Sequence, residues 1–148
     1  MSEELTGKLY GKVIFLTGGG QGIGRECAKA YHRAGAIVAV ADINLDAAKD
    51  TVERSLGGAG LAVHCDVADG PSVAAAIATT VDHLGKLDAI HNNAAVSVPS
   101  KPLHETSEAQ WQRLLDINLK SIYYTTLYGI EALKHSRGAI LNTASMVG

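Results

Sequence analysis

The chain has 148 residues, 47% of them hydrophobic and 19% charged, which is enough apolar material for the core of one globular domain. Its net charge of −2, with lysines and arginines scattered singly, offers no basic surface for nucleic acid or for an anionic membrane. No stretch reaches the roughly 20 apolar residues that span a bilayer, and the acidic start Met1–Glu4 does not resemble a signal peptide.

Neither the cysteines nor the histidines suggest a metal site. Cys27 and Cys65 belong to no CxxC or Cys/His cluster, and we expect both to be buried, reduced thiols. The six histidines show no HExxH or paired spacing. These features together predict a soluble, cytoplasmic protein that holds no metal.

Short apolar runs alternate with longer segments of helical periodicity along the whole chain. The runs, which we expect to be strands, cover residues 13–16, 36–41, 61–65, 87–91 and 139–143. The segments between them repeat apolar residues at helical spacing and end at Gly35, Gly57, Gly85 and, for the longest, about Lys134. That longest helix is expected to begin at a capping box formed by Ser107 and Gln110.

Continuous apolar strands separated by helices are typical of a parallel sheet that is covered on both faces. Right-handed crossovers then give an α/β, doubly wound (Rossmann) fold. Because no linker or repeat divides the chain, residues 1–148 are predicted to belong to a single domain, with the sheet reaching its fifth strand at residues 139–143.

The predicted strands all end on glycine or on small polar residues, namely Thr17-Gly18, Asp42, Asp66, Asn92-Asn93 and Ser145. One such end could be an ordinary helix cap or turn. Ligands of doubly wound folds bind outside the carboxyl ends of the strands, so five such ends together favour a polar ligand site.

The first of these ends opens a glycine-rich loop, Thr17–Gly24. Glycines let the backbone turn tightly and approach a pyrophosphate, whose charge is met by free N–H groups at the start of the next helix. GxGxxG spacing is absent. Gly18-x3-Gly22-x-Gly24 fits a dehydrogenase loop, and Gly20-x-Gly22-x-Gly24 could belong to a methyltransferase.

Asp42 stands about 20 residues beyond the loop, where an acidic residue accepts hydrogen bonds from an adenosine ribose. A carboxylate there would repel a 2′-phosphate, and neither Gln21 nor Ile43 supplies a compensating positive charge. The sequence therefore predicts NAD rather than NADP. Asp42 could also cap a helix, which is compatible with the same role.

Asn118 falls on the helical face that also carries Leu114 and Ile122. An amide buried among such residues is costly unless it has hydrogen-bond partners. Asn118 is thus either a satisfied core asparagine or part of a functional site.

Together these motifs resemble those of the short-chain dehydrogenase/reductase family. Thr17–Gly24 resembles the family's TGxxxGxG loop, Asp66-Val67 looks like its adenine-contacting pair, and Asn92–Ala95 is similar to its NNAG motif. Asn118 and Ser145 stand where the family keeps its active-site asparagine and catalytic serine.

The resemblance implies hydride transfer between NAD and a small secondary alcohol or ketone, sugar-like or steroid-like, and a homodimer or homotetramer assembled through the long helix. Ser145 would hydrogen-bond the substrate oxygen, and Asn118 would anchor a water molecule in the proton relay. The residues that the resemblance places on the cofactor are Gly18, Gln21, Gly22, Ile23, Asp42, Asp66, Val67 and Asn93.

Two positions depart from the family pattern. Ala95 replaces the usual glycine, and none of the five tyrosines is followed by lysine at the fourth position, so the YxxxK pair is absent. Ser145 cannot replace the tyrosine as the general acid/base, because the reaction needs a proton donor or acceptor at the substrate oxygen. We therefore expect these residues to be the first part of a longer enzyme and to bind cofactor at best. The alternatives are a non-catalytic NAD-binding module and, less favoured, a methyltransferase.

Overall fold

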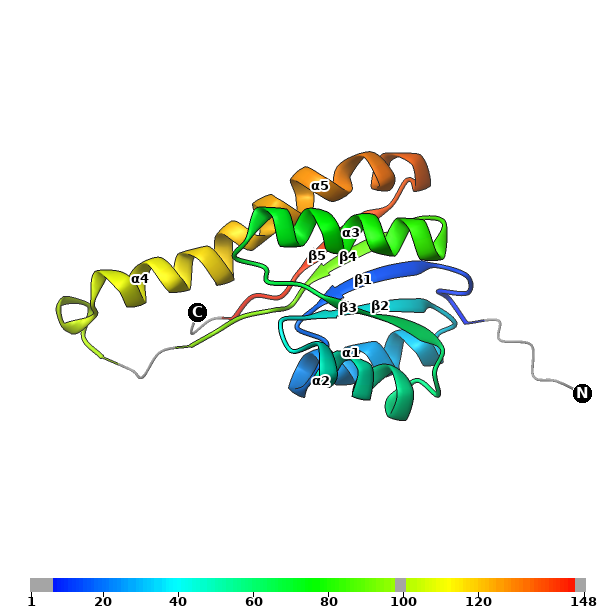
Figure 1. Ribbon diagram of the computed structural model, residues 1–148, viewed down its shortest axis with the longest axis horizontal. Helices are drawn as coiled ribbons and strands as arrows, with labels where there is room; N and C mark the ends of the chain where they lie inside the picture. The colour runs from blue at the N-terminus through cyan, green and yellow to red at the C-terminus, as the bar shows by residue number, and fades with distance from the viewer. Residues whose placement is uncertain (1–6, 98–100, 146–148) are drawn as a thin grey trace, which may run out of the picture.

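Five parallel strands form one sheet in the order β3-β2-β1-β4-β5. The computed structural model describes residues 7–97 and 101–145 (Figure 1). The strands are β1 (Val13–Thr17), β2 (Ile37–Asp42), β3 (Gly60–His64), β4 (Ala89–Asn92) and β5 (Ala139–Asn142). The chain builds outward from β1 through β2 to β3 and then crosses to β4 on the other side of β1. The strand order therefore reverses between β1 and β4, which makes this position the topological switch point of the sheet. The predicted doubly wound fold is confirmed.

Helices cover both faces of the sheet (Figure 1). One face carries α1 (Gly22–Arg33) and α2 (Leu45–Asp50), which continues as the π-helical segment η1 (Thr51–Ser55). The other face carries α3 (Gly70–Leu84) and α5 (Ser121–Ser136). Before α5 come the 3-10 turn η2 (Leu103–Glu105), the helix α4 (Glu108–Leu115) and the π-helical segment η3 (Asp116–Lys120).

The predicted long helix exists, but it is not uniform. Its capping box is present: the Ser107 hydroxyl accepts from the Gln110 N–H at 3.2 Å, and the Gln110 side chain accepts from the Ser107 N–H at 3.1 Å. The π-helical η3 then interrupts the α-helical pattern between α4 and α5. Spacing by three or four residues predicts helix without distinguishing an α turn from a π turn.

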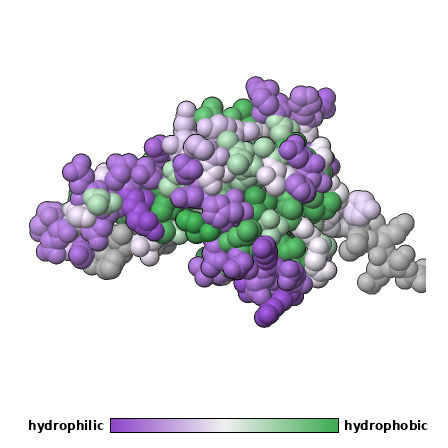
Figure 2. All heavy atoms as spheres, viewed as in Figure 1, coloured by the Kyte–Doolittle hydropathy of each residue, from purple (hydrophilic) through white to green (hydrophobic). Residues whose placement is uncertain are grey.

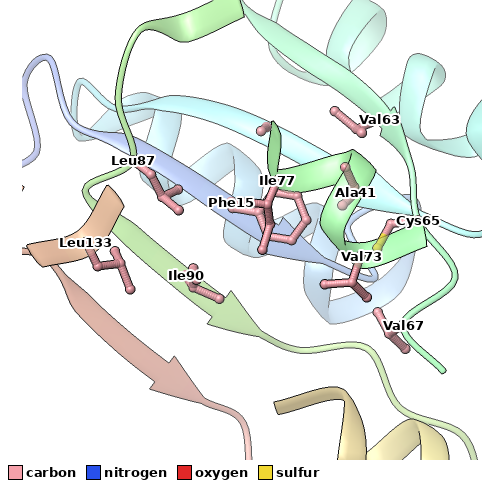
Figure 3. Packing of buried hydrophobic residues seen from close by; sticks show 12 residues of the cluster. Phe15, Ala41, Val63, Cys65, Val67, Val73, Ile77, Leu87, Ile90 and Leu133 are labelled. Atoms are coloured by element: carbon pink, nitrogen blue, oxygen red, sulfur yellow. The ribbon is translucent and has the colours of Figure 1, made fainter. Parts of the chain in front are cut away.

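The core lies in two layers because successive strand residues point to opposite faces. Phe15 and Ile90 face α3 and α5, where they pack with Ile77 and Leu133 (Figure 3). Leu16 faces α1 and α2 and packs with Val38 and other apolar residues of that layer. In Figure 2, apolar surface runs along the middle of the molecule between the two layers of helices, flanked by hydrophilic surface.

Asp88 joins strands at the amino-terminal edge of the sheet, opposite the glycine loop. One carboxylate oxygen accepts from the Val13 N–H at 2.9 Å, and Lys86 and Lys12 lie 3.0 and 3.4 Å from the carboxylate. The Asp88 backbone also bonds to Val13 and Ala139. Burial opposes ionisation of the carboxyl, but the Val13 N–H and the two lysines outweigh it and lower the pKa of Asp88.

We expect Asp88→Asn to destabilise the fold by about 1–2 kcal/mol at neutral pH, because the charged acceptor facing two lysines is lost while one oxygen remains for Val13. The folded pKa of Asp88 lies below its unfolded value, so its stabilisation is complete above roughly pH 4 and is lost as the pH falls through the folded pKa. Urea unfolding of wild type and variant over this range measures the difference. Asp82→Asn, on the exposed side of α3, is the control; a difference that persists in acid would contradict the assignment.

Candidate cofactor and active site

The parallel strands bring most of the predicted site residues to one edge of the sheet. Thr17 and Asp42 end β1 and β2, Asn93 follows β4, and Ser145 lies three residues beyond the end of β5. Residues from four separate parts of the sequence thus lie at the carboxyl edge of one sheet.

Thr17 fixes the loop after β4 against the glycine loop. Its buried hydroxyl oxygen accepts from the backbone N–H groups of Asn93 and Ala94, both at 3.0 Å. The Asn93 amide donates in return to the carbonyl oxygens of Thr17 at 3.2 Å and Gly18 at 3.3 Å. Asn93 was predicted to border the nicotinamide; in the structure its amide group bonds to the end of β1.

Close packing at Gly24 leaves no room for a side chain. A Cβ there would overlap the Gly18 carbonyl oxygen and lie 2.7 Å from the Asn93 amide nitrogen. Gly18 has a positive φ of 66° and packs against Ala94. Gly22 also has a positive φ, 53°, but the space beside it is open. The loop therefore packs tightly on its protein side and presents bare backbone on the other.

The N-terminus of α1 can receive an anion. Its N-cap residue Gln21 makes no side-chain capping bond, and the first turn holds no acidic residue. Gln21, Gly22 and Ile23 are all exposed. The first-turn N–H groups and the positive end of the helix dipole thus face solvent, an arrangement that suits a phosphate.

Asp42 lies directly beside the glycine loop. One carboxylate oxygen accepts from the Gly20 N–H and the other from the Asn44 N–H, both at 2.9 Å. A Cβ on Gly20 would lie 2.8 Å from the Asp42 carboxylate, so only glycine permits this approach. Each carboxylate oxygen can accept further hydrogen bonds. Among the ion pairs of residues 7–97 and 101–145, none involves Asp42.

Arg25 supports the loop, and sequence reasoning did not identify it. Its guanidinium donates to the Gly20 carbonyl oxygen at 2.7 Å and to the Thr51 hydroxyl at 3.0 Å, and it pairs with Asp50 at 3.0 Å. Thr51 donates in turn to the Gly19 carbonyl oxygen. The positive charge nearest the loop is therefore already bound to a carboxylate and to loop oxygens.

Asp66 and Val67 follow β3 and lead toward α3. The Asp66 carboxylate accepts from the Ala68 N–H at 3.0 Å, and the Asp66 N–H donates to the Ser72 hydroxyl at 2.9 Å. Val67 is 8% exposed and packs in the core near Val73 and Cys65 (Figure 3).

Asn118 is exposed, so the possibility of a buried core asparagine is wrong. It lies in the π-helical η3, where its side-chain oxygen accepts from the Val96 N–H and its amide donates to the Val96 carbonyl, both at 2.9 Å. The amide therefore holds the segment that follows Asn93, a position from which it can serve the predicted site.

Asn92 holds the end of β5, which leads to Ser145. The Asn92 amide donates to the Asn142 side-chain oxygen at 2.9 Å, and its own oxygen accepts from the Thr125 hydroxyl at 2.7 Å. The Thr143 N–H donates to the Asn92 carbonyl oxygen. Ser145 itself is exposed.

The two cysteines differ from each other. Cys65 is buried, and burial, with a smaller effect of nearby acidic groups, raises the pKa of its thiol to about 12. Cys27 is only half-buried, so the prediction that both thiols are buried is wrong for it. Both are free thiols. In the part of the chain that the structure describes, no cluster of three or more His, Cys, Asp or Glu residues is arranged to hold a metal ion.

A glycine loop, an open helix N-terminus and a strand-end carboxylate around a switch point are the parts of a dinucleotide-binding domain of the doubly wound class. The family model described as short chain dehydrogenase matches residues 12–148, and the chain belongs to this family. The match favours the dehydrogenase spacing of the loop over the methyltransferase alternative. Within the described ranges, no helix combines the length and apolar character needed to cross a membrane.

Similar proteins are dehydrogenases and reductases. The chain is 40% identical over 142 residues to a 2,5-dichloro-2,5-cyclohexadiene-1,4-diol dehydrogenase of Sphingobium indicum. This alignment covers 95% of this chain and 56% of that protein. It is 35% identical to a cyclohexanol dehydrogenase of Acinetobacter, covering 100% of this chain and 60% of that protein. A 3-ketoacyl-(acyl-carrier-protein) reductase from Brucella melitensis, solved with NADH, superposes with a TM-score of 0.88 at 30% identity and covers 93% of this chain and 58% of that one. The chain thus spans little more than half the length of these proteins.

Proposed function

We propose that the chain is the cofactor-binding part of an NAD-dependent dehydrogenase that acts on a small secondary alcohol or the corresponding ketone. The observation that carries the proposal is the Asp42 carboxylate, which lies beside the glycine loop and forms no ion pair with any residue that the structure describes. A carboxylate accepts hydrogen bonds from the two hydroxyls of a ribose and repels a 2′-phosphate.

The surrounding residues fit the cofactor. The bare backbone at Gly22 leaves space for a pyrophosphate, and the exposed first turn of α1 supplies N–H donors for it. Gly18, Gln21 and Ile23 would line the same part of the cofactor, while Asp66 and Val67 would hold the adenine and Asn93 would border the nicotinamide. When bound, the nicotinamide supplies the hydride acceptor or donor.

The remaining chemistry belongs to side chains near the ends of β4 and β5. Ser145 would donate a hydrogen bond to the substrate oxygen as it changes between alcohol and carbonyl. Asn118, fixed by its two bonds to Val96, would hold a water molecule that carries the proton away. The similar proteins named for cyclohexanol and for a cyclic diol support a small alcohol substrate.

Large exposed apolar side chains along α4, η3 and α5 support a homodimer or homotetramer. These are Trp111, Leu119, Tyr123, Leu127 and Tyr128, from 40% to 62% exposed. An apolar surface of this kind is typical of a protein–protein interface.

We propose further that residues 1–148 act as one domain and that the protein works in the cytoplasm.

Calorimetric titration of NAD and NADP tests the cofactor assignment. We expect the chain and its full-length form to bind NAD at least about 10-fold more tightly than NADP, and Asp42→Ala to reduce this preference to near unity, mostly through loss of NAD affinity. Asp46→Ala, an exposed change on α2, is the matched control.

Tighter binding of NADP by the wild type would contradict the role of Asp42. The full-length protein should also oxidise secondary alcohols such as cyclohexanol. NAD binding without any such oxidation would instead support a non-catalytic NAD-binding module.

A further inference from the structure

A buried histidine links the glycine-loop helix to the end of β5. His91, in β4, is 5% exposed. Its Nδ1 lies 2.9 Å from the Tyr31 hydroxyl on α1, and its Nε2 lies 2.9 Å from the Thr143 hydroxyl beyond β5. The Tyr31 ring also meets the imidazole edge-on, with ring centres 5.9 Å apart. The imidazole therefore connects segments that are 60 and 52 residues away in the sequence.

Both hydrogen bonds can exist at once. Burial lowers the pKa of His91 and favours the neutral ring, which has one donor and one acceptor nitrogen. The hydroxyls of Tyr31 and Thr143 can each donate or accept, so either tautomer satisfies both partners. No buried polar atom of the described side chains lacks a hydrogen-bond partner, which agrees with a complete link.

The end of β5 depends on such links. β5 is four residues long and pairs with β4 through all four of them. Beyond Asn142, the hydrogen bonds that join Thr143 to the sheet are its N–H to the Asn92 carbonyl and its hydroxyl to His91. Ser145 follows two residues later. Each hydrogen bond at the end of a short strand raises the free energy of local opening there, so the bonds of Thr143 restrain the segment that carries Ser145.

We propose that His91 is a positioning residue: it ties Thr143 to Tyr31 on α1 and so holds Ser145 in its working place relative to the bound cofactor. Tyr31 belongs to α1, the helix that begins at the glycine loop, so the link joins that helix to the segment that leads to Ser145. The inference rests on the proposed function, because Ser145 acts there on the substrate oxygen. A displacement of a catalytic group by about 1 Å can cost up to 100-fold in rate, which gives such a link a measurable effect.

Three substitutions in the full-length protein test the link without removing the imidazole. Thr143→Val removes the hydroxyl at nearly constant volume, Thr143→Ser keeps it, and Tyr31→Phe releases the far end of His91. Thr80→Val is the control, because that buried hydroxyl bonds only to Ala76 of its own helix. The readouts are hydrogen exchange of the backbone amides of residues 143–145, NAD affinity by calorimetry, and kcat for alcohol oxidation.

For Thr143→Val we expect amide exchange at residues 143–145 to accelerate about 10-fold and kcat to fall about 10-fold, with NAD affinity within about 2-fold of wild type. Thr143→Ser should stay close to wild type in all three measurements. Tyr31→Phe should accelerate the same amides by about 3-fold, because it releases the far side of the imidazole that holds Thr143.

Unchanged exchange in Thr143→Val and Tyr31→Phe would overturn the proposal, as would a loss of NAD affinity equal to the loss of kcat, which is the sign of general structural damage. If the wild type neither binds NAD nor oxidises alcohols, the proposed function fails. The exchange measurements would then still decide whether His91 restrains the end of β5.

Discussion

Replacing Gly24 with alanine is expected to abolish NAD binding, with a loss of affinity of at least about 100-fold. The added Cβ would overlap the Gly18 carbonyl oxygen, which is part of the backbone. It would also crowd the Asn93 amide, which is held by its hydrogen bond to that oxygen. The start of α1 would have to move away from β1, which would also destabilise the fold by about 1–3 kcal/mol. Calorimetry and urea unfolding measure the two effects.

Ala30→Ser adds one heavy atom on the exposed side of the same helix and should change neither quantity appreciably. NAD affinity within about 3-fold of wild type in Gly24→Ala would show that the loop does not pack as described.

Thr17→Val should lower the stability of the fold by about 2–6 kcal/mol. The Thr17 hydroxyl oxygen accepts from two backbone N–H groups, those of Asn93 and Ala94, and valine would leave both without that acceptor in a partly buried position. Each unsatisfied donor costs about 1–3 kcal/mol. Chemical unfolding of the variant gives the value directly.

Thr17→Ser keeps the oxygen and should retain most of the stability. If Thr17→Val and Thr17→Ser were equally stable, the two backbone donors would have to find other acceptors, and the hydroxyl would not be what joins the ends of β1 and β4.

The sequence was sufficient to predict the architecture. Apolar runs and glycine stops located all five strands to within a few residues, and the small polar residues at their ends lie at the carboxyl edge of the sheet, where we propose the site. Asp42 illustrates why strand ends can be predicted. Its position at the end of β2 follows from the length of the apolar run and from its distance along the chain to the glycine loop, and both are local properties of the sequence. Assigning the residues to cofactor and catalytic roles also required the family resemblance.

What the sequence did not predict depends on contacts between distant residues. Arg25 follows the last glycine of the loop, and its position in the sequence suggests an ordinary surface residue of the helix. Its partners Asp50 and Thr51 are the last residue of α2 and the first of η1. His91 and Asp88 lie inside an apolar run, where the pattern predicts only strand. Their importance appears when the structure brings Thr143 and Val13 to within hydrogen-bond distance.

The bonds from Thr17 to Asn93 also bear on when the protein becomes able to bind a ligand during folding. They join residues 76 positions apart, so the glycine loop is restrained only after β4 has docked beside β1. Contacts this distant in sequence form slowly, because a long loop must close before they contribute. A nascent chain ending before β4 would carry the complete glycine motif without the partner that shapes it, and cofactor capture would mark the late stage of assembly rather than the first βαβ unit.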